Sequence, residues 1–355
     1  MKIERKLRRK QWGSFHTPFL PDLTQESMDP FLEELGSLSQ DEADEVLKGT
    51  FEEEVRWAIG ASKTNKSPGL DRLTFEFYKK TVDKVAGDLV DVFNNQLGKL
   101  KLVDSNQRGA TRCLSKVDGI PMVTQLRPIT LLNIDYKLLT KILMRRIGKV
   151  LGSVLKSVQS CSVPGSNICS AAVNLVSVVE GVERLGMSAA VLSLDLFKAF
   201  DRVNLNFLEV VMKKMKFPEK FLEWMRLVHR DAECCLLLDF ITRPFKVTFS
   251  VRQGDPLVMI LFLIYIEPLV MMVERKVEGV KFLVRPAKSL WCPEMVGLEE
   301  RVEAYVEDVE VVVGSDADIL LVDQIVDRFE EVSRAILNRS SKSVILGLGA
   351  GTGSQ

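Results

Sequence analysis

Two short stretches of the sequence place carboxylates where strands are expected. Asp195 ends the apolar run 189–194, and Glu307 and Asp308 stand together inside AYVEDVEVVVG (304–314). Acidic residues are poor strand formers, so their presence needs a reason. One interpretation is structural, because turns that face water accept acids and an Asp after a strand often caps the next helix. The other interpretation is a site for a divalent cation.

The cation interpretation requires that the two stretches be neighbours in one sheet. In that case Asp195, Glu307 and Asp308 would converge on one edge. Carboxylates held close together repel each other, and their pKa values rise unless a cation joins them. Hard oxygen ligands suit Mg²⁺, and two such ions about 4 Å apart stabilise the attacking and leaving oxygens of a phosphoryl transfer. The acids therefore indicate nucleotidyl transfer.

Hydrophobic periodicity predicts the elements that would position these acids. The acidic segment 22–50 is expected to form a linker or short helices. From residue 189 onward, the order of strand, helices, strands, helix, strand pair and helix favours an α+β fold with helices on one face of an antiparallel sheet. A strand is expected at 189–194, hairpins at 233–251 and 304–314, and helices at 51–62, 82–98, 134–156, 204–215, 219–230, 256–273 and 316–337.

Composition limits the class of protein. The chain has 355 residues with 46% apolar residues and a net charge of zero, which allows two or three subdomains and argues against coating nucleic acid by bulk charge. The six cysteines form no CxxC and only two histidines occur, so a structural zinc site is not expected. We expect a reducing, intracellular setting, nucleus or cytoplasm, without a secretion signal or membrane span.

Six blocks in order resemble the reverse transcriptase of non-LTR (LINE-type) retrotransposons. The blocks cover most of the chain, from about residue 63 to residue 347, and AYVEDVEVVV stands where that family carries Tyr-x-Asp-Asp. The other five are NKSPGLDRLTFEFYKK, LRPITLLNIDYKLLTKILMRRI, LSLDLFKAFDRV, VRQGDPL and SRAILNRSSKSVILG.

The resemblance implies a fold and an activity. The fold is α+β, a right-hand polymerase with fingers and a ferredoxin-like palm and without a thumb. The expected domains are a basic and acidic extension (1–50), fingers (51–188), a palm (189–347) and a disordered tail (348–355). The activity is RNA-directed DNA polymerisation with two Mg²⁺ ions, or Mn²⁺ as an alternative. The expected partners are an RNA template, a DNA primer and deoxynucleotide triphosphates, with no membrane.

The resemblance also assigns roles to single residues. Catalysis and metal binding fall to Asp195, Glu307 and Asp308, with the Leu196 carbonyl as a further metal ligand. Without the resemblance, Phe200 is a core residue, Arg127 and Lys66 are surface charges, and Lys342 is a solvated lysine. Asp201 and Asn204 are expected to cap the next helix. The implied nucleotide-binding residues are Phe200, Gln253, Gly254, Arg127, Lys66 and Lys342.

Several positions depart from the family pattern. Glu307 replaces an Asp, which moves the carboxylate by about one C–C bond, roughly 1.5 Å, and a displacement near 1 Å can cost about 100-fold in rate. Arg72 stands where a glycine is usual, and Cys161, Ser162 and Ser166 replace a glycine, an aromatic and a basic residue. Three functions stay open: a polymerase that is impaired or inactive, a non-catalytic nucleic-acid-binding remnant that uses the fingers and the basic face of helix 134–156, and the product of a decayed retroelement.

Overall fold

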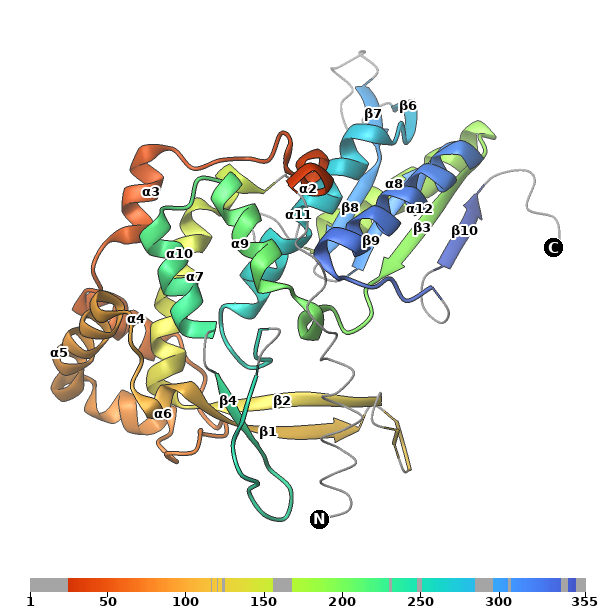
Figure 1. Cartoon of the computed structure of the whole chain (residues 1–355). Coiled ribbons are helices and arrows are strands. Elements are labelled where there is room, and N and C mark those ends of the chain that lie inside the picture. Colours follow the sequence, from red (N-terminus) through yellow and green to blue (C-terminus); the bar gives the residue numbers. More distant parts are fainter. Residues whose placement is uncertain are drawn as a thin grey trace, which may run out of the picture. The chain divides into compact units, whose positions relative to one another are not determined.

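The computed structural model describes residues 25–115, 117–119, 121–122, 125–155, 168–229, 232–247, 251–284, 296–305, 308–339 and 344–348. The chain forms two compact units, and neither is continuous in sequence (Figure 1). The described residues of the first unit fall in Leu38–Val150 and Lys216–Ile260, and those of the second fall in Gln25–Ser37, Leu151–Met215 and from Leu261 onward.

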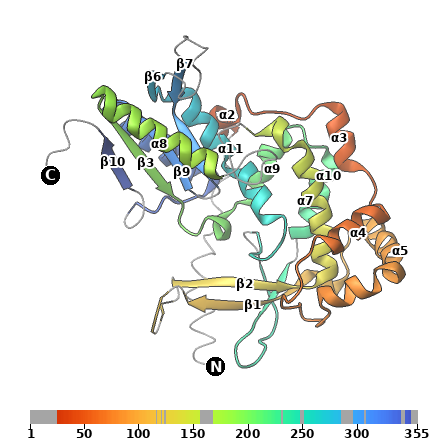
Figure 2. The ribbon, with the colours of Figure 1, turned by 180° about the vertical axis from the view of Figure 1, so that it is seen from behind.

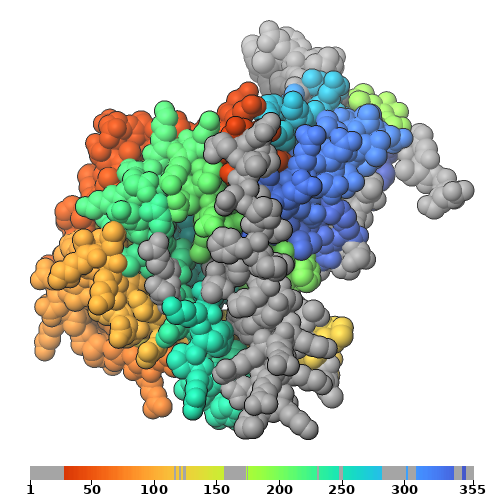
Figure 3. Space-filling view, in the orientation of Figure 1, coloured from red at the N-terminus to blue at the C-terminus, as the bar shows by residue number. Residues whose placement is uncertain are grey.

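The first unit combines helices with a four-stranded sheet of order β2-β1-β4-β5. β1 is antiparallel to β2 and parallel to β4, while β4 and β5 form the short hairpin expected over 233–251. The loop between β4 and β5 stands out at the lower edge of Figure 3. The elements are α3 (Gln40–Leu47), α4 (Glu52–Gly60), α5 (Phe75–Lys99), α6 (Asp104–Gln107), β1 (Arg108–Ser115), β2 (Leu126–Leu132), α7 (Ile134–Val154, whose last turn belongs to the second unit), α10 (Glu219–His229), β4 (Glu233–Leu236) and β5 (Phe245–Lys246).

The second unit is built on an antiparallel sheet of order β10-β3-β9-β8. Its central strand β3 pairs with β9 on one side and with β10 on the other. The strands β6 (Val280–Val284) and β7 (Val296–Glu300) form a separate pair. The other elements are α2 (Gln25–Leu32), α8 (Ile168–Leu185), β3 (Ala189–Asp195), the 3-10 helix η2 (Ala199–Arg202), α9 (Leu205–Lys214), α11 (Val258–Lys276), β8 (Val302–Tyr305), β9 (Asp308–Val313), α12 (Asp316–Ser333) and β10 (Val344–Leu348).

Helices cover both faces of this sheet. Figure 1 shows α12 in front of the strands, and the opposite view of Figure 2 shows α8 in front of them. Val178 and Val182 of α8 share a buried cluster with Val191 and Val312. Residues 190–192 and 311–313 are all buried, so β3 and β9 bury both of their faces. The prediction of helices on one face only is therefore wrong.

The core helix expected at 256–273 is α11, and it is buried along most of its length. Its rings join an aromatic cluster of the second unit, in which Phe207 and Tyr265 contact Phe329 of α12 at 5.8 and 6.1 Å between centroids. Tyr265 also donates its hydroxyl proton to the Ser333 carbonyl at 2.8 Å. Among the helices of the described residues, none is long and apolar enough to cross a membrane.

Two helix predictions had the wrong bounds. α5 begins at Phe75 rather than at residue 82, and its apolar Val92 is 41% exposed while the next residue, Phe93, is fully buried. α12 ends at Ser333 rather than at residue 337, because Arg334 adopts a left-handed conformation with φ 67°. That early end leaves residues 335–338 outside the helix, and Leu337 forms an antiparallel bridge with Leu196, the residue after β3.

The predicted fold class is confirmed, since the described residues form a mixed helix and sheet structure with antiparallel pairing around β3. The expected short helices in 22–50 are α2 and α3. A capping box starts α3, in which Ser39 and Glu42 exchange hydrogen bonds between side chain and backbone. The extension 1–24 and the tail beyond 348 lie outside the described residues.

Candidate functional site

The two acidic stretches lie on neighbouring strands of one sheet. β3 and β9 pair antiparallel from Ala190↔Val313 to Asp195↔Asp308. Asp195 and Asp308 therefore stand directly opposite each other, at one end of the β3–β9 ladder. This is the neighbourhood that the cation interpretation required. Glu307 precedes β9 and lies outside the described residues.

Asp195 is held by a segment that follows α12. The Asn338 side chain donates Nδ2–H to Asp195 Oδ2 at 2.9 Å, and the Asn338 backbone N–H donates to the Asp195 carbonyl at 2.8 Å. The Phe197 N–H donates to the Ile336 carbonyl at 2.7 Å. Leu196, the proposed carbonyl ligand, is buried and bridges Leu337. Asn338 lies in the block SRAILNRSSKSVILG, to which the resemblance assigns no single-residue role at this position.

The face of β3 that carries Asp195 changes from apolar to polar along the strand. Side chains alternate between faces, so Val191, Ser193 and Asp195 share one face. Val191 packs under α8, whereas the Ser193 hydroxyl donates to Glu310 Oε1 of β9 at 2.8 Å. The polar end of this face therefore carries Asp195 of β3 and Glu310 of β9.

Phe200 lies five residues after Asp195, in the 3-10 helix η2. Its ring is half-buried and packs on Phe262 of α11, with 5.1 Å between centroids. Asn204 caps α9 as expected, because its side-chain oxygen accepts from the N–H groups of Asn206 and Phe207. Asp201 lies inside η2 and is not the cap of α9, so that prediction is wrong.

Gln253 and Gly254 belong to the first unit and form a turn against β2. The Thr130 N–H donates to the Gln253 carbonyl at 2.8 Å. Gly254 has φ +115°, and a Cβ at this position would lie 2.4 Å from the Thr130 carbonyl oxygen. Only glycine fits this conformation and this approach without strain. The protein itself thus needs Gly254, whether or not a base pair approaches it.

A buried polar cluster supports this turn. The Tyr136 hydroxyl donates to Asp255 Oδ2 at 2.6 Å, and the Arg252 guanidinium lies 4.5 Å from the centre of the Tyr136 ring. Arg252 also donates to the carbonyls of Gln107 and Val228 at 3.2 and 3.4 Å. Burial raises the pKa of Tyr136 well above its usual value. Its hydroxyl thus stays protonated and can donate at any physiological pH.

The remaining predicted nucleotide-binding residues are spread over several elements. Arg127 is exposed on β2, opposite Leu114 of β1 and three residues before the Thr130 that holds the Gln253 turn. Lys66 is exposed in the loop between α4 and α5. Lys342 lies outside the described residues. The structure brings Arg127 near the Gln253 turn along one strand but does not join Lys66 to either.

The loop that holds Lys66 also contains a substituted glycine position. Arg72 has φ +62°, the left-handed conformation that glycine adopts without cost. The turn is closed by the Arg72 N–H, which donates to the Gly69 carbonyl at 3.2 Å. The backbone thus keeps the conformation that suits glycine although the side chain has changed.

The chemistry of the donor set fits a divalent cation in part. Carboxylate oxygens at the paired positions Asp195 and Asp308 are the donors that Mg²⁺ prefers. Within the described residues no group of three His, Cys, Asp or Glu side chains gathers for a metal ion. The further donors expected from the resemblance are Glu307, which lies beyond those residues, and the Leu196 carbonyl.

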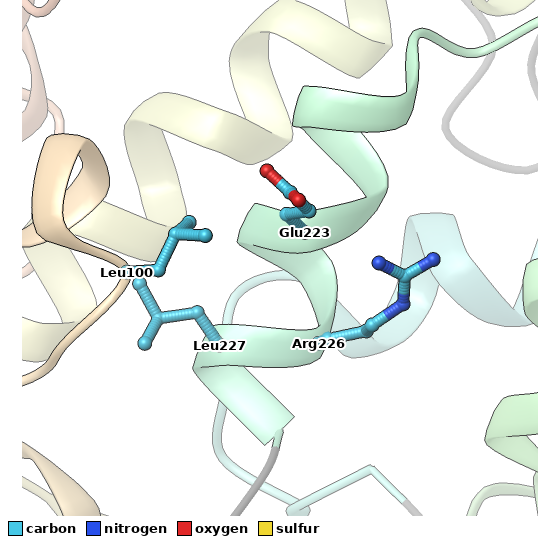
Figure 4. Close-up of a pocket in the computed structure, with 4 residues that line it drawn as sticks. All are labelled: Leu100, Glu223, Arg226 and Leu227. Atoms are coloured by element: carbon cyan, nitrogen blue, oxygen red, sulfur yellow. The ribbon is translucent and has the colours of Figure 1, made fainter.

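One pocket of the first unit is unrelated to these residues. It has a volume of about 150 Å³ and is lined by Leu100 at the end of α5 and by Glu223, Arg226 and Leu227 of α10 (Figure 4). Arg226 is paired with Glu219 at 2.7 Å. None of the predicted site residues lines this pocket.

Comparison with known proteins places the chain among reverse transcriptases. The family described as "Reverse transcriptase (RNA-dependent DNA polymerase)" matches residues 114–345, more than half of the chain. A Xenopus laevis protein, "Transposon TX1 uncharacterized 149 kDa protein", is 30% identical over 295 residues. The match covers 83% of this chain and 22% of that protein, so the chain spans about a fifth of its relative's length.

Two solved structures of a Candida Tropicalis protein are similar to the chain. One is the "Structure of apo telomerase from Candida Tropicalis truncated from C-terminal domain", with a TM-score of 0.49, 14% identity, and coverage of 82% of this chain and 59% of that chain. The other is telomerase "in complexe with TWJ fragment of telomeric RNA", with a TM-score of 0.46, 12% identity, and coverage of 82% and 48%.

Proposed function

Because the chain belongs to the reverse transcriptase (RNA-dependent DNA polymerase) family, we propose that it is the polymerase region of a LINE-type transposon protein. The proposed reaction is RNA-directed DNA synthesis by two-metal nucleotidyl transfer, impaired by Glu307. The observation that carries this proposal is the pairing of Asp195 with Asp308 across β3 and β9. The similarity to a protein named Transposon TX1 supports the transposon origin.

Asp195, Glu307 and Asp308 would hold the divalent cations, with the Leu196 carbonyl as a further ligand. Bound Mg²⁺ or Mn²⁺ would neutralise charge on the reacting phosphoryl oxygens. The chain's own residues fix the donors: the Asn338 segment anchors the Asp195 backbone at 2.8 Å, and the β3–β9 ladder sets its distance from Asp308. An acid one methylene longer at position 307 would displace one donor from this frame.

The other assigned residues would bind the nucleotide and the template. Phe200, packed on Phe262, would present its ring to the sugar and exclude a 2′-hydroxyl. Gln253 and Gly254 would contact the nascent base pair from a turn fixed to β2. Arg127, Lys66 and Lys342 would meet phosphates. The partners are then an RNA template, a DNA primer and deoxynucleotide triphosphates, in the nucleus or cytoplasm. The fingers (51–188) and palm (189–347) divide this work in the proposal.

Primer extension tests the proposal. Wild type, Asp195→Ala and Glu307→Asp are compared on poly(rA)/oligo(dT) with Mg²⁺ or Mn²⁺, after circular dichroism has shown that each is folded. We expect weak incorporation by wild type, none by Asp195→Ala, and a rise of about 100-fold in Glu307→Asp. Incorporation that survives in Asp195→Ala, or its absence from both wild type and Glu307→Asp, would contradict the proposal.

A second candidate function is RNA binding without catalysis, and two cations of α7, Lys141 and Arg145, favour it. Two other cations of this helix are neutralised within the first unit: Arg146 pairs with Glu54 at 2.6 Å, and Lys149 pairs with Glu45 at 2.9 Å. These ion pairs leave little charge for a phosphate. The basic face expected on helix 134–156 is therefore only partly available.

Lys141 and Arg145 of the same helix lie over an aromatic ring instead. Arg145 lies 4.2 Å and Lys141 5.6 Å from the centre of the Trp57 ring, and Lys141 donates to the Ser62 hydroxyl at 3.0 Å. No carboxylate in the part of the chain that the structure describes forms an ion pair with either cation. Burial, and then the nearby charge of Lys79, lower the pKa of Lys141. A phosphate backbone would relieve this uncompensated positive charge.

Salt titrations of RNA binding test this second candidate. For a single-stranded RNA, each phosphate contact contributes about 0.7 to the slope of log K against log salt. Lys141→Gln with Arg145→Gln should therefore reduce the slope by about 1.4, while Lys149→Gln, whose charge is already paired, should change it little. Equal effects of the two changes, or none, would contradict a phosphate site at Trp57.

A further inference from the structure

The geometry around Asp195 points to a residue that the family resemblance left without a role. We propose that Asn338 is a positioning residue that orients the Asp195 carboxylate for cation binding. This inference rests on the proposed function, because it concerns the same site. It adds to that function a side chain 143 residues away in sequence that contacts the acid directly.

The contact has two parts that can be separated. The backbone of Asn338 donates to the Asp195 carbonyl at 2.8 Å, and the Phe197 N–H donates to the Ile336 carbonyl at 2.7 Å. These bonds form an antiparallel bridge between Leu196 and Leu337 and do not depend on any side chain. The Asn338 amide adds a bond to Asp195 Oδ2 at 2.9 Å. A change of the side chain therefore leaves the backbone anchor in place.

The chemistry of an amide suits this task. A carboxylate at the end of a strand rotates about its χ angles, and a fixed donor on one oxygen selects one orientation of the other. A lysine or arginine in this place would also orient Asp195 but would neutralise part of its charge and compete with a cation. Asn338 donates without bringing charge. Its amide thus orients the acid without neutralising its negative charge.

The position of Asn338 is itself set by the fold. α12 ends at Ser333 because Arg334 has φ 67°. The Leu337 N–H then donates to a carboxylate oxygen of Glu330 in α12. Arg339, the next residue, pairs with Glu330 at 2.9 Å and also with Asp327. The segment is thus attached to α12 on either side of Asn338.

Mn²⁺ binding to the full chain, measured by the electron paramagnetic resonance signal of free Mn²⁺, tests the proposal without requiring activity. The variants are Asn338→Leu, which has a similar shape but no donor, Asp195→Ala, and Arg339→Gln as a control for the attachment to α12. Loss of a residue that orients a metal ligand weakens affinity by about 10- to 100-fold. We expect this loss in Asn338→Leu at an unchanged urea midpoint, with affinity close to wild type in Arg339→Gln. If Asn338→Leu does not fold, Asn338→Ala replaces it.

The outcomes separate the two proposals. Wild-type Mn²⁺ affinity in Asn338→Leu, together with lost affinity in Asp195→Ala, would overturn the role of Asn338 and leave the proposed function intact. An equal loss in Arg339→Gln and Asn338→Leu would also overturn it, because the attachment of the segment would then matter and not the amide. If Asp195→Ala binds Mn²⁺ as wild type does, the metal site of the proposed function fails first.

Discussion

Gly254 gives the most quantitative test of how the first unit holds its turn. Gly254 has φ +115°, a conformation that L residues rarely adopt. An alanine held in it by Gly254→Ala would lower the free energy of unfolding by about 1–3 kcal/mol. The new Cβ would also lie 2.4 Å from the Thr130 carbonyl oxygen, and relief of such overpacking costs about 1–3 kcal/mol. The neighbour is backbone in β2, so it cannot rotate away. The expected loss is about 2–6 kcal/mol of the free energy of unfolding.

Urea unfolding followed by tryptophan fluorescence measures this loss, because Trp57 and Trp224 lie in the first unit. Gly87→Ala is the matched control: Gly87 lies inside α5, and its added Cβ would meet nothing within 4 Å. The free energy of unfolding of that control should rise by about 0.8–1 kcal/mol, the difference in helix propensity between glycine and alanine. A Gly254→Ala protein as stable as wild type would refute the strained turn.

Three further predictions concern single side chains. Arg72→Gly should raise the free energy of unfolding by about 1–2 kcal/mol, since it relieves the left-handed φ of +62°; an unchanged or lower urea midpoint would contradict this. Tyr136→Phe should lower the free energy of unfolding by about 1.5–3 kcal/mol, because Asp255 loses the hydroxyl that donates to it at 2.6 Å. A urea midpoint equal to that of wild type would mean that water replaces the hydroxyl. Burial lowers the pKa of His229 to about 4 from 6.5, so as the pH falls the unfolded chain binds the proton before the folded chain does. The free energy of unfolding should therefore fall by up to about 3 kcal/mol as the pH drops from about 6.5 to 4. The His229→Leu protein should lack this pH dependence, and parallel pH curves of the two proteins would rule it out.

Local patterning predicted the elements that position the site. The alternating and apolar runs around Asp195 and Asp308 became β3, β8 and β9, and the apolar run at 256–273 became the buried helix α11. Each of these signals lies within about ten to twenty consecutive residues. Periodicity records which face is buried, so such segments can be predicted without knowledge of their neighbours.

The errors arose where distant segments decide the outcome. Apolar residues alone do not tell which face of α5 is buried, because Val92 is apolar yet 41% exposed, and the packing of α4 against α5 determines which side is covered. Burial of both faces of β3 depends on α8 and α12, which come before and after it in the sequence. The end of α12 at Arg334 depends on a left-handed backbone conformation that an arginine does not signal.

The same reason explains which parts of the site were predicted. The resemblance gave Asp195 and Asp308 as a pair, and the β3–β9 register places them opposite each other. Asn338 was not predicted, since its contact with Asp195 spans 143 residues and an Asn in a loop is ordinary. Its place in the quoted segment SRAILNRSSKSVILG was a usable signal, because a polar residue just after α12 can reach the end of β3 once the helix stops at Ser333.

In the proposed function, Asp195 and the acids at 307 and 308 together form the site for divalent cations. When hydrogen peroxide and ascorbate are added, Fe²⁺ bound in place of Mg²⁺ is oxidised by the peroxide to Fe³⁺ and releases hydroxide and a hydroxyl radical, and ascorbate restores the Fe²⁺. The radicals cut the nearby backbone, so the cut positions report the site without need of polymerase activity. We expect two cuts, near residues 195 and 307–308, which fade together as Mg²⁺ is added and are absent in Asp195→Ala. Cuts at other positions only, or the same two cuts in Asp195→Ala, would contradict it.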